Sequence, residues 1–200
     1  MSAEENTKHK YHHGDLADAL VDATLTLLAR KGPALLSLRE VARVAGVSHG
    51  APAHHFGDKA GLLTAVALQG HQLLAERLSE SQVQNQSSEA RLQAAGEAYI
   101  RFAVTKPAHF SIMFQPDLIN PDDPAYRAAG AASFRVLESC VRALLSPSHG
   151  DDGSINATVV ALWSQVHGFA SLWLAGNFGD PDDLDLLETL IEDTLTSLKR

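Results

Sequence analysis

The apolar residues of this 200-residue chain recur at helical spacing along its whole length, and no segment alternates as a β-strand does. Leu16, Leu20, Ala23 and Leu27 share one face of a first helix, for which Gly32 is a suitable C-terminal cap. The same spacing and its breaks predict further helices over residues 37–45, 48–56, 58–80, 89–105, 108–114, 125–145, 154–176 and 182–198. The pattern therefore predicts an all-α fold of about nine helices.

Residues 37–56 have the order of a helix-turn-helix: a short helix, a turn with glycine, and a second short helix. Ser37 with Glu40 forms a capping box at the first helix, and Ser48 is the expected N-cap of the second. Pro52 then falls at or just beyond the first turn, where proline is tolerated. The residues expected to pack the pair inward are Leu38, Val41, Ala42, Ala45, Val47 and Phe56.

Residues 153–179 contain no Lys, Arg, Asp or Glu, so two readings of this stretch are open. Its length suffices to span a bilayer, but Ser164, Gln165 and His167 lie in its middle, and both flanks are acidic. A helix that is apolar on most sides is otherwise buried on most sides. We favour a helix buried on two faces and no membrane insertion.

The charge of the chain is unevenly distributed. Residues 1–60 hold seven Lys/Arg and seven Asp/Glu with six of the ten histidines, whereas residues 61–200 carry the whole net charge of −8. Phosphate repels such an acidic surface, so any DNA contact is expected within the first sixty residues.

Other features narrow the function classes. A single cysteine, Cys140, excludes an intrachain disulfide and a Cys-rich zinc site, and no apolar secretory signal opens the chain. We therefore expect a cytoplasmic protein. The chain also lacks the G-x-S-x-G, P-loop, G-x-G-x-x-G and H-E-x-x-H motifs, so we predict that it is not an enzyme and needs no cofactor.

Several stretches carry a family resemblance. "YHHGDLADALVDATLTLLARKG" and "SLREVARVAGVSHGAPAHHFGDKAGLL" resemble the DNA-binding segment of the TetR family of bacterial transcriptional repressors. "HFSIMFQPDL" and "LWSQVHGFASLWL" resemble the C-terminal domain of one branch, called WHG after its Trp…His-Gly, which here is Trp163, His167 and Gly168. The resemblance covers most of the chain.

This resemblance implies a homodimer with a three-helix DNA-binding domain over residues 1–57 and an effector-binding and dimerisation domain over residues 58–200. It also implies that the last two helices form the dimer interface. There, Leu184, Leu187, Ile191, Leu195 and Leu198 form a narrow seam, which either pairs two protomers or packs inside one.

The resemblance also places the candidate DNA contacts. Lys59 resembles the family's phosphate-binding lysine. Many members have a DNA-contacting tyrosine where this chain has Ala53, so the residues next to Ala53 are expected to make the DNA contacts here. Lys10, with Lys8 and Tyr11, forms a basic arm that either follows DNA or is a loose terminus. The candidate DNA-binding residues are Lys10, Ser37, Arg39, Ser48, His49, Gly50, Ala53, His54, His55 and Lys59.

The adjacent pair His54 and His55 also raises the possibility of a metal site. Adjacent residues on a helix point about 100° apart, so the two rings do not converge on one ion. Asp58 follows His54 by four residues, but Gly57 is expected to end the helix between them. We therefore predict no bound metal.

Large side chains of the C-terminal helices are candidates for an apolar effector cavity. The alternative is a filled core, and His167 either orients a ligand or bonds to a neighbour. The candidate ligand-binding residues are Phe102, Phe110, Met113, Phe114, Trp163 and His167. We expect a repressor that a small apolar effector releases from a palindromic DNA operator. A non-DNA-binding dimeric helical sensor or scaffold is the alternative, and a helical-bundle enzyme ranks third.

Overall fold

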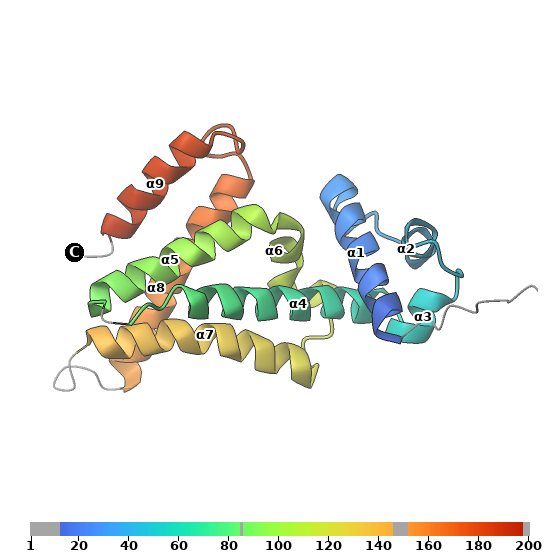
Figure 1. Ribbon diagram of the computed structural model, residues 1–200, viewed down its shortest axis with the longest axis horizontal. Helices are drawn as coiled ribbons and strands as arrows, with labels where there is room; N and C mark the ends of the chain where they lie inside the picture. Colours follow the sequence, from blue (N-terminus) through green and yellow to red (C-terminus); the bar gives the residue numbers. More distant parts are fainter. Residues whose placement is uncertain (1–12, 85, 146–151, 198–200) are drawn as a thin grey trace, which may run out of the picture.

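The computed structural model describes residues 13–84, 86–145 and 152–197, and over these residues the chain is helical without strands (Figure 1). This confirms the predicted all-α class. The helices are α1 (His13–Lys31), α2 (Leu38–Val44), α3 (Ala51–Phe56), α4 (Lys59–Glu80), α5 (Ser88–Thr105), α6 (Pro107–Met113), α7 (Pro124–Leu144), α8 (Asp152–Leu174) and α9 (Leu184–Ser197). A short 3₁₀ turn, Pro116–Leu118, lies in the predicted proline-rich loop.

The helices pack around two hydrophobic clusters. The first joins α1 and α2 to the first turns of α4, and Ile112 and Ile119 also belong to it. The second is built from the later part of α4 with α5 to α9. Figure 1 shows α1 to α3 grouped at one end of α4, while α5 and α7 lie along it. The first cluster thus includes residues of α4, beyond the domain boundary predicted between residues 57 and 58. That boundary stays a prediction.

Local chemistry explains where the helices begin. Asp58 accepts a hydrogen bond from the Gly61 amide at 2.8 Å, so it caps α4 at the predicted place. Ser37 caps α2 by accepting from the Glu40 amide at 3.3 Å, whereas the Glu40 carboxylate pairs with Lys31 of α1. Only the N-cap half of the predicted capping box therefore forms.

The start of α3 differs from the prediction. Ser48 is not its N-cap: the helix begins at Ala51 after Gly50, and the Ser48 carbonyl accepts from the Ala51 amide at 3.0 Å. The turn therefore takes two more residues than expected. Pro52 still falls in the first turn of the helix, as predicted, where its missing N–H costs no intrahelical bond, and its ring is buried.

The predicted seam of α9 lies inside the protomer. Leu187, Ile191 and Leu195 are buried in the second cluster, where α9 packs against α5. Leu184 is exposed, and Leu198 lies outside the described residues. The interpretation of this seam as a dimer contact is therefore wrong, because α5 already covers it.

Helix α8 is buried on one face only, so the prediction of two buried faces is wrong. Val159, Val166 and Trp173 are buried, but Val160 on another side of the helix is 53% exposed. Trp163 and His167 are half-buried. None of the helices in the described ranges is long and apolar enough to span a membrane.

We expect Gly61→Ala to destabilise the junction of α3 and α4. A Cβ at this position would lie 2.0 Å from the backbone oxygen of Phe56, and a backbone atom does not move aside cheaply. By analogy with overpacked cores, the free energy of unfolding should fall by about 1–3 kcal/mol, measured by urea denaturation.

Gly130→Ala is the matched control, since Gly130 also lies within a helix but a Cβ there would make ordinary contacts at 3.7 Å with His71. Its helix propensity should leave stability equal or raise it by up to about 1 kcal/mol. Equal stabilities of the two variants would contradict the close approach at Gly61.

Candidate functional site

The helix-turn-helix forms a compact unit at one end of the molecule. Val41 and Ala42 of α2 are buried, and the Val47 amide donates to the Ala42 carbonyl at 3.0 Å, which closes the turn. Val47 and Phe56 pack against the first hydrophobic cluster from either end of α3. Because these apolar residues face inward, the opposite faces of α2 and α3 are left for solvent or a partner (Figure 1).

Most candidate DNA contacts lie on that outer surface. Lys10 and the rest of the basic arm fall outside the described residues. His55 and Lys59 are half-buried. The exposed members are Ser37, Arg39, Ser48, His49, Gly50, Ala53 and His54. The fold thus brings residues from α2, the turn and α3 onto one end of the protein.

Lys59 has a partner within the protein. Its Nζ donates to the Pro33 carbonyl in the α1–α2 connection at 2.7 Å. This contact ties the start of α4 to the connection between α1 and α2. The ammonium retains two further donor hydrogens, as any lysine has three.

The histidine pair of α3 is arranged as its spacing requires. The His54 and His55 rings lie 5.7 Å apart and nearly perpendicular. Gly57, at φ +78°, ends α3 before Asp58 begins the next helix. Among the described residues, no group of three or more His, Cys, Asp or Glu side chains is placed to hold a metal ion.

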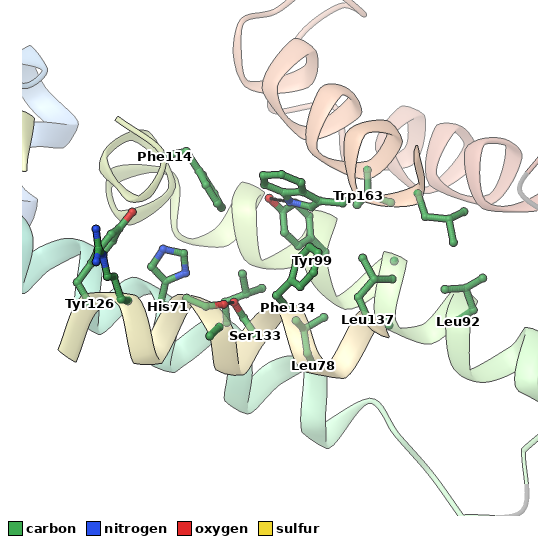
Figure 2. A pocket seen from close by; sticks show the side chains of 18 residues that line it. His71, Leu78, Leu92, Tyr99, Phe114, Tyr126, Ser133, Phe134, Leu137 and Trp163 are labelled. Carbon is green, nitrogen blue, oxygen red and sulfur yellow. Dashed lines mark hydrogen bonds between the residues drawn. The ribbon is translucent and has the colours of Figure 1, made fainter. Parts of the chain in front are cut away.

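A cavity of about 420 Å³ lies between α4, α5, α7 and α8, with Phe114 at one side (Figure 2). Leucines, alanines and aromatic rings form most of its wall. Its polar members are His71, Tyr99, Tyr126, Arg127, Ser133 and Trp163. The volume falls in the range of roughly 300–1,000 Å³ that is usual for small-molecule pockets.

The predicted ligand-binding residues divide into two groups. Phe114 and Trp163 line the pocket. Phe102, Phe110 and Met113 are buried in the hydrophobic cluster beside it. His167 contacts the rings of Phe110, Phe114 and Trp163 and lies behind this wall.

Tyr99 bonds to both Trp163 and His167 of the WHG motif. Its hydroxyl lies 2.8 Å from His167 Nδ1 and accepts a hydrogen bond from Trp163 Nε1 at 3.3 Å. Burial lowers the pKa of His167 and raises that of Tyr99, which favours the neutral form of both groups. Of the two roles open to His167, the structure shows the bond to a neighbour, which fixes Trp163 in the pocket wall.

Several pocket residues were missed from the sequence, chiefly His71, Tyr99, Tyr126, Ser133 and Phe134. They come from α4, α5 and α7, whose lining side chains point toward one space although the helices are far apart in the chain (Figure 2). One signal was available. His71 lies on the buried stripe of α4, where a polar side chain needs an explanation.

Arg127 is the only formally charged residue in the described lining, apart from histidine. Its guanidinium pairs with Asp122 and donates to the Pro121 carbonyl at 2.9 Å. The charge at the pocket edge is therefore already matched by a carboxylate. No Asp or Glu of the described chain lines the pocket.

Comparisons with known proteins bear on both sites. Residues 20–66 match the family of bacterial regulatory proteins, tetR family, and residues 92–195 match the tetracyclin repressor-like C-terminal domain. No curated protein matches the chain in sequence.

Several solved structures share its fold. A Rhodococcus sp. RHA1 protein of unknown function is 26% identical, with a TM-score of 0.74 over 96% of this chain and 100% of that one. The TetR-family regulator PfmR of Thermus thermophilus is 18% identical, with a TM-score of 0.70 over 90% and 96%. Bacillus subtilis FadR, solved in complex with stearoyl-CoA, is 13% identical, with a TM-score of 0.70 over 90% and 96%.

The C-terminal match covers more than half of the chain, and the N-terminal match covers the helix-turn-helix. Both agree with the all-helical arrangement and with the placement of the DNA-binding unit at one end. The chain therefore belongs to the TetR family of bacterial transcriptional regulators.

Proposed function

We propose that this regulator is a ligand-responsive repressor, which a small and predominantly apolar effector releases from a palindromic operator. One observation carries the proposal: α4 borders both sites. Its first turn packs against α3, and its later residues His71, Leu74 and Leu78 line the pocket. A ligand that favours one placement of α4 therefore also favours one placement of the DNA-binding unit.

The lining supports an apolar effector. A charged ligand needs a buried countercharge to offset its desolvation, and Arg127 is already paired with Asp122. The stearoyl-CoA complex of B. subtilis FadR shows that a protein of this fold binds a molecule with a long apolar chain. We extend only the apolar character of that ligand to this chain.

The position of helix α6 supports a second structural connection between the pocket and the DNA-binding unit, through which a conformational change could pass. Ile112 belongs to the hydrophobic cluster of the DNA-binding end, and the next residue, Met113, belongs to the cluster around the pocket. Phe114 then lines the pocket itself. If ligand displaced Phe114, Ile112, which is only two residues away and packs against α1, would therefore also move.

The outer face of α8 supports dimerisation through the last two helices. Ala157, Val160, Ala161, Ser164 and Leu172 are exposed and lie on one side of the helix, opposite its buried face. None of them is charged, which is unusual for a solvated face. A second copy of the chain is the occupant we propose, because two DNA-binding units are needed to read a palindrome.

The first experiment is to establish DNA binding. Selection of bound duplexes from random DNA, followed by mobility shift, should yield a palindrome whose half-sites lie about 34–36 Å apart, or a multiple of that distance. A dimeric protein that retains no duplex would support the alternative of a helical sensor that does not bind DNA. The proposed role also implies a cytoplasmic protein, since that is where a bacterial operator lies.

We predict that Arg39→Ala weakens DNA binding to a similar degree for all sequences. Arg39 is exposed near the start of α2, where a phosphate contact fixes position and does not read bases. The slope of log affinity against log salt concentration should fall by about 1 for each phosphate that a protomer no longer touches. Lys106→Ala removes the same charge at an exposed site on the α5–α6 junction and should leave the slope unchanged. Equal slopes for Arg39→Ala and the wild type would show that Arg39 does not contact a DNA phosphate.

We predict that Ala161→Asp gives folded monomers. A carboxylate in the centre of the α8 face would be buried without a partner in the dimer but solvated in the monomer. Sedimentation velocity should show the loss of the dimer, and the mobility shift should show the loss of operator binding. Ala128→Asp makes the same change on an exposed position of α7 and should stay dimeric. If the Ala161→Asp variant stays dimeric, the outer face of α8 is not the dimer interface.

A further inference from the structure

Two buried side-chain nitrogens of the described chain have no hydrogen-bond partner: Nδ1 of His71 and Nε1 of Trp173. Trp173 lies in the hydrophobic cluster, whereas His71 is 5% exposed and lines the pocket. A buried polar atom costs free energy unless some group supplies its bond. For His71, the space next to the ring is the pocket.

Packing fixes the orientation of this imidazole. Its centroid lies 5.5 Å from that of Phe114 and 5.3 Å from that of Tyr126, both in edge-on geometry. Gly130 of α7 lies next to the ring, since a Cβ there would be 3.7 Å from it, an ordinary van der Waals contact. Figure 2 shows the ring directed from α4 into the space between Phe114, Tyr126 and Ser133. The ring is therefore a fixed part of the wall.

The hydrogen-bonding role of Nδ1 depends on which ring nitrogen carries the proton. A neutral imidazole donates at one nitrogen and accepts at the other. We assign the proton to Nε2, an assignment that the probes described below test. Burial lowers the pKa of His71, which keeps the ring neutral at neutral pH. Nδ1 of a neutral ring protonated on Nε2 is an acceptor.

The other polar groups of the wall are engaged within the protein. Ser133 donates to a carbonyl of its own helix at 2.9 Å, and Tyr126 donates to the last carbonyl of α6 at 2.9 Å. Trp163 donates to the Tyr99 hydroxyl, and Arg127 pairs with a carboxylate outside the lining. The hydroxyl oxygens of Ser133 and Tyr126 keep lone pairs that can accept, but each hydroxyl already makes one hydrogen bond. His71 Nδ1 is the buried polar atom of the described wall that makes none.

We propose that His71 Nδ1 is the polar anchor of the effector, and that the effector is an apolar molecule carrying a hydrogen-bond donor, such as the hydroxyl of an alcohol or a phenol. The proposal rests on the pocket being the effector site, as proposed above. It adds the chemistry of the group that orients the ligand.

A carboxylate is a poorer occupant than a hydroxyl. An ionised carboxylate has only acceptors, and so it would face the acceptor lone pair of Nδ1. It would also need a countercharge at this depth. A hydroxyl supplies the missing donor and brings no net charge, while its hydrocarbon part contacts the leucines and rings of the wall.

The test uses two probes that differ in one donor hydrogen: 4-octylphenol and its methyl ether, 4-octylanisole. Affinities are measured by isothermal titration calorimetry on the full-length protein, with thermal shift as a second readout. The wild type should bind the phenol about three- to tenfold more tightly than the ether, the value of one net hydrogen bond.

Three variants locate the acceptor. His71→Phe fills the site with a ring that cannot accept, and the preference for the phenol should disappear. His71→Asn keeps an acceptor oxygen near the position of Nδ1 and should retain the preference. Ser133→Ala is the control within the pocket, because it removes the other oxygen next to His71 that could accept from the phenol, and it should also retain the preference.

His71→Phe also has an expected effect without ligand. Replacing an unsatisfied buried polar group by an apolar one is neutral or stabilising, so its melting temperature should not fall below that of the wild type. A purely structural histidine would give the opposite result.

The outcomes separate the two proposals. Equal wild-type affinity for phenol and ether, or a phenol preference that survives in His71→Phe, overturns the anchor and leaves the pocket as the effector site. Absence of binding by both probes overturns both. A preference that depends on His71 but leaves operator binding unchanged supports the anchor and overturns the release mechanism.

Discussion

The contact between α4 and α6 is the constraint on which both sites depend. Three consecutive residues of α4 make it. Gln69 Oε1 lies 2.9 Å from His109 Nε2, a Cβ on Gly70 would lie 2.6 Å from Met113 Sδ, and the His71 ring packs edge-on against Phe114, the C-cap of α6, at 5.5 Å. The absence of a side chain at Gly70 leaves the space that the Met113 side chain occupies. Any larger residue at Gly70 would require Met113 to move.

This close contact also places α6 in both hydrophobic clusters. Ile112 packs under the DNA-binding unit, while Met113 and Phe114 belong to the pocket side. A tightly packed contact of this kind does not deform gradually, since interiors are as dense as organic crystals. In the proposed mechanism, a ligand that fills the pocket against Phe114 would therefore favour one of a few discrete placements of α6. Differential affinity for those placements is the only way in which a ligand shifts the DNA-binding state.

The local parts of this fold were predictable from the sequence. Helical spacing placed the helices to within a few residues, and Asp58 marked the start of α4 because its carboxylate caps that helix. The N-cap of α3 was predicted wrongly at Ser48. Serine is a good N-cap wherever a helix begins, but the turn closes through Val47 and Ala42, and this bond delays the helix to Ala51. A cap residue in the sequence indicates that a helix begins nearby, and the hydrogen bonds of the turn determine the residue at which it begins.

The pocket lining was predictable only in part. Helical periodicity shows which residues of α5, α6 and α8 face inward, but a residue facing inward lies either in the filled core or at a cavity. Phe102 and Phe114 both face inward, and only Phe114 reaches the space. The side chains of α4 and α7 on the other side of the space determine whether such a residue lies in the core or at the cavity. They come from sequence positions tens of residues away. His71 was the one local signal, because a polar side chain on an apolar stripe must find a partner.

The seam of α9 shows the same limit. A spacing of three and four residues indicates that a helix packs against another helix, but it does not identify the partner. Gly96 of α5 decides it here: Leu195 fills the space that a Cβ at Gly96 would occupy, at 2.6 Å. At the rim of the same contact, Arg101 of α5 makes two hydrogen bonds with Glu188 of α9, at 2.7 and 2.6 Å. Both groups are about half exposed, so the pair orients α9 more than it stabilises it. The apolar seam of α9 is covered from within, so α9 has only its remaining faces for the proposed dimer. The uncharged outer face of α8 is for this reason the apolar surface that we propose for that interface.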